Sequence, residues 1–249
     1  MAYLEPNIPF EQSPNYDPGT GKYPKIGYVF HATLGKFVGA KATLKASKRL
    51  DANGNDIGRA SSHLLISEND HEWCELVKPM DIAWHAGKID APDPIGQKVL
   101  LKDSTGHYIN PNQYLLGIEF CCGWDANHNG KVDFTELNLT DWQYEAAAQY
   151  LARNEIMYGI KINPQFIVGH KNITSYKSDD MYRHVAKVVA RAQEIVKAAQ
   201  APDPVPVVQP SKTPDEVCIT QSDVADLKTK IANKQVIGIF QWLKNLLTK

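Results

Sequence analysis

The sequence predicts an α/β protein in which helices flank a central mixed β-sheet, followed by a small C-terminal helical segment. Two observations favour this class. Apolar runs of strand length alternate with segments of helical periodicity over residues 24–200, which is typical of layered α/β folds. The chain is also 249 residues long and 43% hydrophobic, which is enough to bury a full core.

The expected elements follow one another along residues 24–200. Strands are expected at Ile26–His31, Ser62–Ile66, Trp73–Val77, Leu115–Cys121 and Gln165–Val168. A helix is expected to begin near Thr140, because Thr140 and Gln143 have the spacing of a capping box ahead of an apolar run. A last helix is expected from about Asp180 to Ala199, since its acidic start suits the helix dipole.

Three further segments lie outside this domain. Residues 1–23 are rich in proline, asparagine and glycine without periodicity, so we expect an extended arm that lies over the domain. The repeated prolines of residues 201–214 favour a stiff linker. Residues 215–249 carry two short helical patterns, the second with an apolar face bordered by lysines. This segment is interpreted as a packed helical hairpin, or alternatively as a surface for the cell wall, for self-association or for anionic lipid.

Charge and composition exclude several classes of protein. The net charge is −1, so no basic field indicates nucleic-acid binding. The sequence has no apolar run of membrane-spanning length, and the residues after Met1 do not resemble a secretory signal, so we expect synthesis in a cytoplasm. The four cysteines do not suggest a disulfide scaffold in a chain this long, and Cys121 and Cys122 should point to opposite faces of a strand.

Two histidines and a carboxylate offer a set of ligands for a catalytic zinc ion. His31 closes an apolar strand, and His170 follows Val168-Gly169 at the end of another, where active sites of α/β sheets usually lie. Asp179 comes nine residues later. Zinc with three such ligands keeps a fourth position for water. A lone buried histidine, by contrast, is more often an ordinary core residue.

The order of the motifs makes the interpretation specific. Between the two histidines lie Trp84-His85-Ala86-Gly87 and Gly117-Ile118-Glu119. In this arrangement the chain resembles the zinc-dependent type-2 N-acetylmuramoyl-L-alanine amidases, whose fold is shared with phage T7 lysozyme and the peptidoglycan recognition proteins. The resemblance covers about residues 24–196 and implies zinc bound by His31, His170 and Asp179. Family members often have Pro-Gly after the metal carboxylate, whereas Asp180-Met181 follows here. Asp180 is therefore the alternative ligand, although the spacing from Lys177 favours Asp179.

The resemblance also assigns roles in catalysis. Glu119 is a carboxylate within an apolar strand, where burial raises the pKa of a carboxyl and suits it to act as a general base. The alternative is a strand residue on a solvated face. The resemblance implies that Glu119 is the base, used where other members have tyrosine, and that Lys177 stabilises the oxyanion. Without the resemblance, Lys177 would be interpreted as a solvated loop residue.

The remaining histidines compete with this assignment. The resemblance places Trp84 and His85 in the lining of the substrate groove, and His63 in a strand position that is structural or faces the substrate. No metal role is expected for the other four, of which two lie in polar loops and two are interpreted as surface residues: His107, His128, His71 and His184.

A second motif predicts a calcium site. Residues 125–136 fit the twelve-residue EF-hand loop, with Gly130 at the sharp turn. The expected ligands are Asp125, Asn127, Asn129, Lys131 (through its backbone carbonyl), Asp133 and Glu136. The alternative is a metal-free turn rich in Asn and Asp, because such turns are common.

The residues alone imply zinc-assisted amide hydrolysis, and residues 125–136 add a candidate Ca²⁺ site. The resemblance implies that the amide is the one between N-acetylmuramic acid and L-alanine in peptidoglycan. A phage endolysin is expected, made in the host cytoplasm without a signal peptide and acting at the cell wall after release. The alternatives are a cytoplasmic peptidoglycan-recycling amidase, a non-catalytic peptidoglycan-binding protein and a structural calcium-binding module. The C-terminal segment argues against recycling, since a soluble substrate needs no tether.

Overall fold

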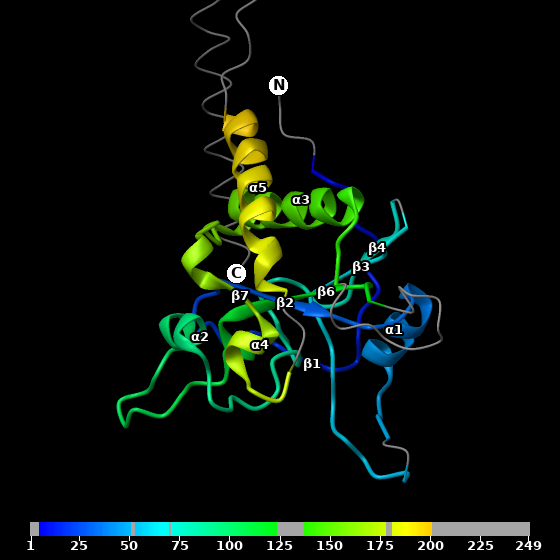
Figure 1. Cartoon of the computed structure of the whole chain (residues 1–249), viewed down its shortest axis with the longest axis vertical. Coiled ribbons are helices and arrows are strands. Elements are labelled where there is room, and N and C mark those ends of the chain that lie inside the picture. Colours follow the sequence, from blue (N-terminus) through cyan, green and yellow to red (C-terminus); the bar gives the residue numbers. More distant parts are fainter. Residues whose placement is uncertain (1–4, 51–52, 70, 124–136, 178–180, 201–249) are drawn as a thin grey trace, which may run out of the picture. The chain divides into compact units, whose positions relative to one another are not determined.

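The computed structural model describes residues 5–50, 53–69, 71–123, 137–177 and 181–200 (Figure 1). The expected calcium loop, both candidate carboxylate ligands and the C-terminal segment lie outside these ranges. The strands are β1 (Tyr16–Asp17), β2 (Gly27–Ala32), β3 (Leu64–Ile66), β4 (Trp73–Glu75), β5 (Ile82–Ala83), β6 (Leu115–Phe120) and β7 (Ile167–Gly169). The α-helices are α1 (Phe37–Lys45), α2 (Pro94–Val99), α3 (Asp141–Tyr158), α4 (His170–Ile173) and α5 (Val185–Gln200).

The main sheet has five strands in the order β4-β3-β6-β2-β7. Strand β2 lies between β6 and β7 and pairs in parallel with both. Strand β3 is parallel to β6, whereas β4 is antiparallel to β3. The sheet is therefore mixed, and the predicted fold class is confirmed.

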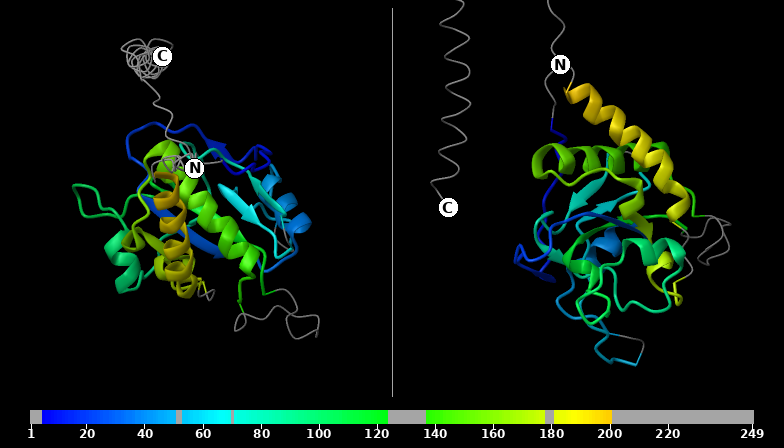
Figure 2. Two further views of the ribbon diagram at one scale, coloured as in Figure 1. Left: turned by 90° about the horizontal axis from the view of Figure 1, so that it is seen from above. Right: turned by 90° about the vertical axis from the view of Figure 1, so that its left-hand side faces the viewer.

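Alternation along the strands separates two faces of this sheet, since successive side chains point to opposite sides. Tyr28 and Phe30 of β2 belong to the core that is closed by α3 and α5, which lie side by side over one face (Figure 2). Val29 packs in a separate core on the other face. In the same way, Cys121 and Cys122 belong to different cores, as their adjacency predicts. His31 is in phase with Val29 and therefore lies on the face opposite α3 and α5.

The start of α3 confirms the predicted capping box. The hydroxyl of Thr140 accepts a hydrogen bond from the backbone N–H of Gln143 at 3.3 Å, and the Gln143 side chain accepts one from the Thr140 N–H at 3.1 Å. At the other end Gly159 adopts a left-handed conformation with φ of 72°. Its backbone N–H bonds to carbonyls of the last turn, which ends the helix.

Other boundaries differ from the prediction. Helix α5 begins at Val185 rather than at Asp180, because a 3₁₀ turn, η3 (Tyr182–His184), precedes it. The strand expected from Gln165 begins at Ile167, since a second 3₁₀ turn, η2 (Pro164–Phe166), comes first. Helices α1 and α2 were not predicted from the sequence. None of the helices in the described ranges is long and apolar enough to cross a membrane.

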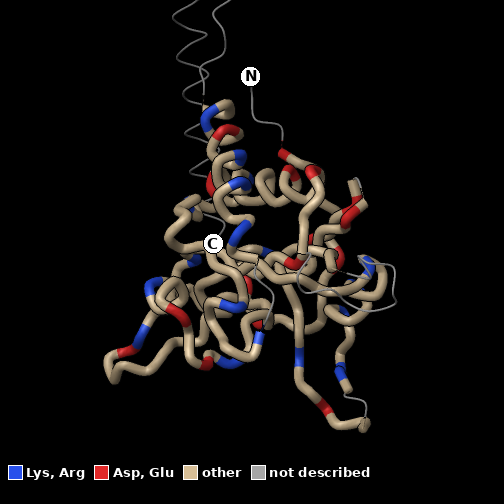
Figure 3. Tube along the Cα trace, in the orientation of Figure 1, with Lys and Arg blue, Asp and Glu red and all other residues tan. Residues whose placement is uncertain are grey.

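The described part of the N-terminal region, residues 5–23, runs along the domain without a helix. Strand β1 pairs with β5, and the backbone N–H of Ser13 bonds to the carbonyl of Leu76 at 2.8 Å. The carboxylate of Glu11 contacts Lys41 and Lys45 of α1. Basic and acidic residues are both spread over the described trace (Figure 3).

Candidate active site

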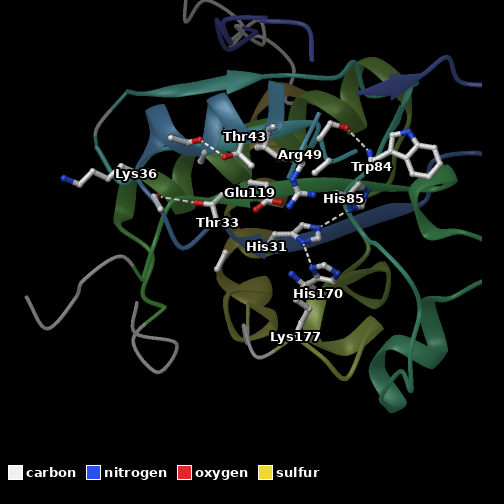
Figure 4. A pocket seen from close by; sticks show the side chains of 17 residues that line it. His31, Thr33, Lys36, Thr43, Arg49, Trp84, His85, Glu119, His170 and Lys177 are labelled. Atoms are coloured by element: carbon white, nitrogen blue, oxygen red, sulfur yellow. Dashed lines mark hydrogen bonds between the residues drawn. The ribbon is translucent and has the colours of Figure 1, made fainter. Parts of the chain in front are cut away.

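A pocket of about 610 Å³ opens where the parallel strands end (Figure 4). His31 comes from the end of β2, Glu119 from the end of β6, and His170 is the first residue after β7. The carboxyl ends of parallel strands meet at one edge of a sheet, which is where α/β proteins bind their ligands. The remaining polar lining comes from loops and α1: Thr33, Lys36, Thr43, Arg49, Ser61, Trp84, His85 and Lys177.

Strand register fixes the order of three of these groups. His31 is the direct partner of Glu119 on β6, so both side chains point to the same face of the sheet. On the other side, Phe30 pairs with Gly169 of β7, which brings the following residue, His170, next to His31. The sheet thus places a carboxylate and two imidazoles in a row across three adjacent strands.

The two imidazoles meet through the same type of nitrogen. The Nδ1 atoms of His31 and His170 are 2.9 Å apart. The two rings are nearly perpendicular, with an angle of 74° between their planes. Both residues are buried, His31 with 3% and His170 with 5% of its surface exposed.

The tautomer of His170 follows from its second nitrogen. Nε2 lies 3.0 Å from the backbone carbonyl of Ala86. A carbonyl only accepts hydrogen bonds, so Nε2 carries the proton of the neutral ring. The Nδ1 atom of His170 therefore presents a lone pair toward His31.

A chain of two hydrogen bonds gives His31 the same tautomer. The Nε2 atom of His85 lies 3.1 Å from the carbonyl of Leu115 and must donate to it, which leaves Nδ1 of His85 as an acceptor. The Nε2 atom of His31, 3.1 Å away, donates to that acceptor. Its own Nδ1 then has no proton. His85 lines the pocket, and its ring also orients His31.

The two facing lone pairs fit a zinc ion. They cannot bond to each other, because neither neutral ring has a proton left to share. Zinc held by two imidazole nitrogens in tetrahedral geometry needs them about 3.3 Å apart, so a small separation of the rings would admit it. Among the described residues, no group of three or more His, Cys, Asp or Glu side chains is arranged to hold a metal. The third predicted ligand, Asp179, and its alternative, Asp180, lie outside the described residues.

Electrostatics keep these rings neutral. Burial lowers the pKa of His31 well below its usual value, and the neighbouring His170, His85 and Lys177 lower it further. Burial first, and then the charge of Lys177, lower the pKa of His170 to about 4. Burial also lowers the pKa of His85 to about 3. Metal binding requires neutral imidazoles, so the site does not have to lose protons near neutral pH.

The two predicted catalytic groups both reach the pocket. Glu119 is half-buried and Lys177 is exposed at the pocket rim. In Figure 4 they lie on different sides of the imidazole pair. One group that can accept a proton and one cation therefore flank the lone pairs.

His63, expected to be structural or to face the substrate, lies outside the pocket. It is fully buried and is not part of the pocket lining. Its Nδ1 accepts a hydrogen bond from the backbone N–H of Gly117 at 3.0 Å, and its Nε2 contacts the carbonyl of Asp81 at 3.2 Å. Its role here is to hold β6 and the loop before β5. Trp84 does line the pocket, with the Arg59 guanidinium 4.9 Å from its ring centre.

The expectation for His184 was wrong. His184 has 5% of its surface exposed, and its ring contacts the hydroxyl of Tyr144 and the carbonyl of Leu137, each at 2.7 Å. Residues His71 and His107 are exposed, as expected. His128 lies outside the described residues.

Sequence reasoning missed two cations of the pocket. Lys36 lies just before α1, and Arg49 lies in the loop after α1. Neither belongs to a motif or to a periodic segment, so only the folded chain brings them to the pocket that Glu119 also lines. With Lys177 they make the charged lining mostly positive, which favours an anionic ligand.

Comparison with known proteins relates this chain to one family. A family model described as N-acetylmuramoyl-L-alanine amidase matches residues 22–194. A search of curated proteins gives no significant match. A solved structure of AmpD, as its selenomethionine derivative, is 24% identical, covers 79% of this chain and 99% of its own, and has a TM-score of 0.51. This likeness concerns the fold.

Two further solved structures are similar to a smaller degree. AmpDh3 from Pseudomonas aeruginosa is 19% identical, covers 72% of this chain and 69% of its own, and has a TM-score of 0.44. The endolysin amidase LysCS from Clostridium intestinale URNW is 14% identical, covers 74% of this chain and 95% of its own, and has a TM-score of 0.43.

Proposed function

Because the chain belongs to the N-acetylmuramoyl-L-alanine amidase family, we propose that it is a zinc-dependent hydrolase. It cleaves the amide between the lactyl group of N-acetylmuramic acid and the L-alanine of the stem peptide, with zinc held by His31, His170 and Asp179. One observation carries this proposal. The Nδ1 lone pairs of His31 and His170 face each other at 2.9 Å beside a carboxylate, in a pocket large enough for a sugar and the start of a peptide.

Each group has a defined role in the proposed reaction. Zinc bound at the imidazole pair supplies Lewis-acid chemistry to the scissile carbonyl and the water. Glu119 takes a proton from the attacking water while the oxygen of this water bonds to the carbonyl carbon. Lys177 stabilises the negative charge that develops on the carbonyl oxygen. Glu119 then gives the proton to the nitrogen as the carbon–nitrogen bond breaks, which releases the peptide with a free L-alanine amine.

The biological setting is proposed to be that of an endolysin. The support comes from the sequence, in which the proline-rich residues 201–214 separate the amidase domain from a further segment, residues 215–249. Such a segment suits an enzyme that acts on an insoluble wall. A recycling amidase would act on soluble muropeptides instead.

Calcium binding is proposed for residues 125–136. Its support is the spacing of the oxygen ligands around Gly130, because the loop lies outside the described residues. The loop follows β6, the strand that carries Glu119.

Digestion of purified sacculi tests the activity and the setting together. Mass spectrometry of the soluble products is expected to find stem peptides that begin with free L-alanine, without new sugar reducing ends. The His170→Ala variant should release none, and the His107→Ala variant, which changes an exposed histidine outside the pocket, should release as much as the wild type. Cleavage between sugars or within the peptide would overturn the proposal. Activity confined to soluble muropeptides would instead indicate recycling.

A further inference from the structure

Both imidazoles of the proposed zinc site are oriented by one turn. The carbonyl of Ala86 accepts from Nε2 of His170, and the ring of the preceding residue, His85, accepts from Nε2 of His31. A shift of this turn would therefore rotate both lone pairs at once. The position of the turn affects metal binding, because hydrogen bonds to the second nitrogen fix ring orientation and basicity.

One side-chain oxygen accepts two hydrogen bonds from the backbone of this turn. Oδ1 of Asn112 accepts hydrogen bonds from the backbone N–H of His85 at 3.1 Å and of Ala86 at 2.9 Å. Asn112 is 2% exposed and is not part of the pocket lining. It thus touches neither the imidazole pair nor the space for a substrate.

Asn112 is itself held in place. It lies in a 3₁₀ turn, η1 (Pro111–Gln113), directly before β6. Its backbone N–H donates to the side chain of Asn110 at 3.0 Å, and its carbonyl accepts from the ammonium of the buried Lys25 at 3.3 Å. The oxygen that supports the turn is therefore anchored to the start of the same strand that carries Glu119.

On the side away from Asn112, the ring of His85 packs closely against Gly117 of β6. A Cβ atom at Gly117 would lie 2.5 Å from Cγ of His85, so only glycine leaves room for the ring against β6. The ring also donates to the carbonyl of Leu115 on that strand. Asn112 and Gly117 together define where the His85 ring can lie.

We propose that Asn112 is a positioning residue for the zinc site, acting through the backbone of His85 and Ala86. The inference rests on the proposed zinc dependence and adds a residue that the ligand set does not contain. Loss of the Oδ1 acceptor leaves two buried N–H groups without a partner and lets the turn move. Both lone pairs then lose their alignment, although every proposed ligand is still present.

The test is the zinc affinity of the full-length protein, measured by competition with a chromophoric chelator. Asn112→Leu keeps the size of the side chain and removes the acceptor, so the dissociation constant for zinc should rise about 10- to 100-fold, as for other groups that orient metal ligands. Asn112→Asp keeps an acceptor oxygen in the same place and should restore the wild-type affinity.

Asn15→Leu is the matched control. Asn15 is also 2% exposed, and its side chain also makes two hydrogen bonds to backbone, donating to the carbonyls of Ala46 and Ala60 at 2.7 and 3.0 Å. This variant should lower the melting temperature of the zinc-free protein, as Asn112→Leu should, but keep the wild-type affinity for zinc.

The outcomes separate the two proposals. A folded Asn112→Leu variant that binds zinc as tightly as the wild type overturns the positioning role and leaves the proposed function intact. A wild-type protein that binds no zinc overturns both. If Asn112→Leu shows no cooperative unfolding, Asn112→Ala provides the same test, because its smaller side chain also lacks the acceptor. An unchanged zinc affinity in a folded Asn112→Ala protein would then overturn the positioning role.

Discussion

At the scale of single residues, the proposed site separates the residues that would hold zinc from those proposed to transfer a proton or stabilise charge. His31 and His170 point their lone pairs at each other, whereas Glu119 and Lys177 reach the pocket from different sides. Measurements of metal content and of turnover can distinguish the two groups of residues. A variant in the first group should lose both properties, and a variant in the second should lose only turnover.

Glu119→Gln should lower kcat by about 10²-fold or more, because the amide cannot take the proton of the attacking water. Lys177→Ala should lower kcat by about 10²-fold through lost stabilisation of the oxyanion. Both proteins should keep the wild-type zinc content, measured by atomic absorption. Lys171→Ala, an exposed lysine on α4, is the control and should keep full turnover. Zinc loss in the Glu119 variant would mean that a ligand has been mistaken for a catalyst.

Much of the residue-level assignment was accessible from the sequence. His31 and His170 follow apolar strands, so their place at one sheet edge could be predicted. The contact between His31 and His85 could not, because 54 positions separate them and no motif spacing links them. The same is true of Arg49, which enters the pocket from a loop without a pattern. The fully buried position of His63 depends on how β6 and the loop before β5 pack around it.

At the scale of elements, the N-terminal residues and α1 are joined by a cluster of charges. The carboxylate of Glu11 contacts Lys41 at 2.8 Å and Lys45 at 2.9 Å. Hydrogen bonds from these two ammonium groups lower the pKa of Glu11 from 4.5 to about 2. Since α1 forms a wall of the pocket, this contact ties the N-terminal residues to the site.

Glu11→Gln should lower the free energy of unfolding by about 0.5 to 1 kcal/mol at pH 7, the range for partly exposed ion pairs. The folded-state pKa lies below the unfolded one, so the carboxylate stabilises the fold above about pH 4.5 and loses this effect as the pH falls toward 2. Urea unfolding at several pH values measures the difference, which should shrink with acidification. A difference that stays constant from pH 7 to pH 3 would contradict the ion-pair explanation. Glu68→Gln, an exposed carboxylate, should have little effect at either pH.

The elements themselves were predicted unevenly. The start of α3 was correct because a capping box is a local signal. Helix α1 has no side-chain hydrogen bond at its N-cap residue, Lys36, and therefore gives no such signal. At the N-cap of α2 the side chain of Asp93 does accept such hydrogen bonds, but this helix is only six residues long. The expected start at Asp180 preceded α5 because a 3₁₀ turn has nearly the same side-chain spacing as an α-helix.

At the scale of the whole molecule, the calcium proposal links two motifs that lie close in sequence. The loop of residues 125–136 begins six residues after Glu119. Calcium that binds only the folded state stabilises it by about 2.7 kcal/mol at a hundredfold excess over the dissociation constant. For a chain of this size the melting temperature should rise by about 5 to 10 °C.

Scanning calorimetry with and without millimolar calcium measures this shift. Asp125→Ala should remove the response and leave the zinc content unchanged. Asp103→Ala is the control, because Asp103 lies in an exposed turn outside residues 125–136 and accepts from the backbone N–H groups of Thr105 and His107. It should keep the full response. Identical melting curves with calcium and with a calcium-selective chelator would leave residues 125–136 as a turn without a metal.

The match of the family model to residues 22–194 places the chain in an amidase family, and we propose that the reaction takes place at the imidazole pair. The most direct measurement is cleavage of a defined muramyl peptide, followed by mass spectrometry, before and after zinc removal. The account predicts release of a peptide with a free L-alanine amine, loss of this cleavage in the zinc-free protein, and recovery on addition of one equivalent of zinc. Undiminished cleavage by the zinc-free protein, or cleavage at any other bond, would contradict it.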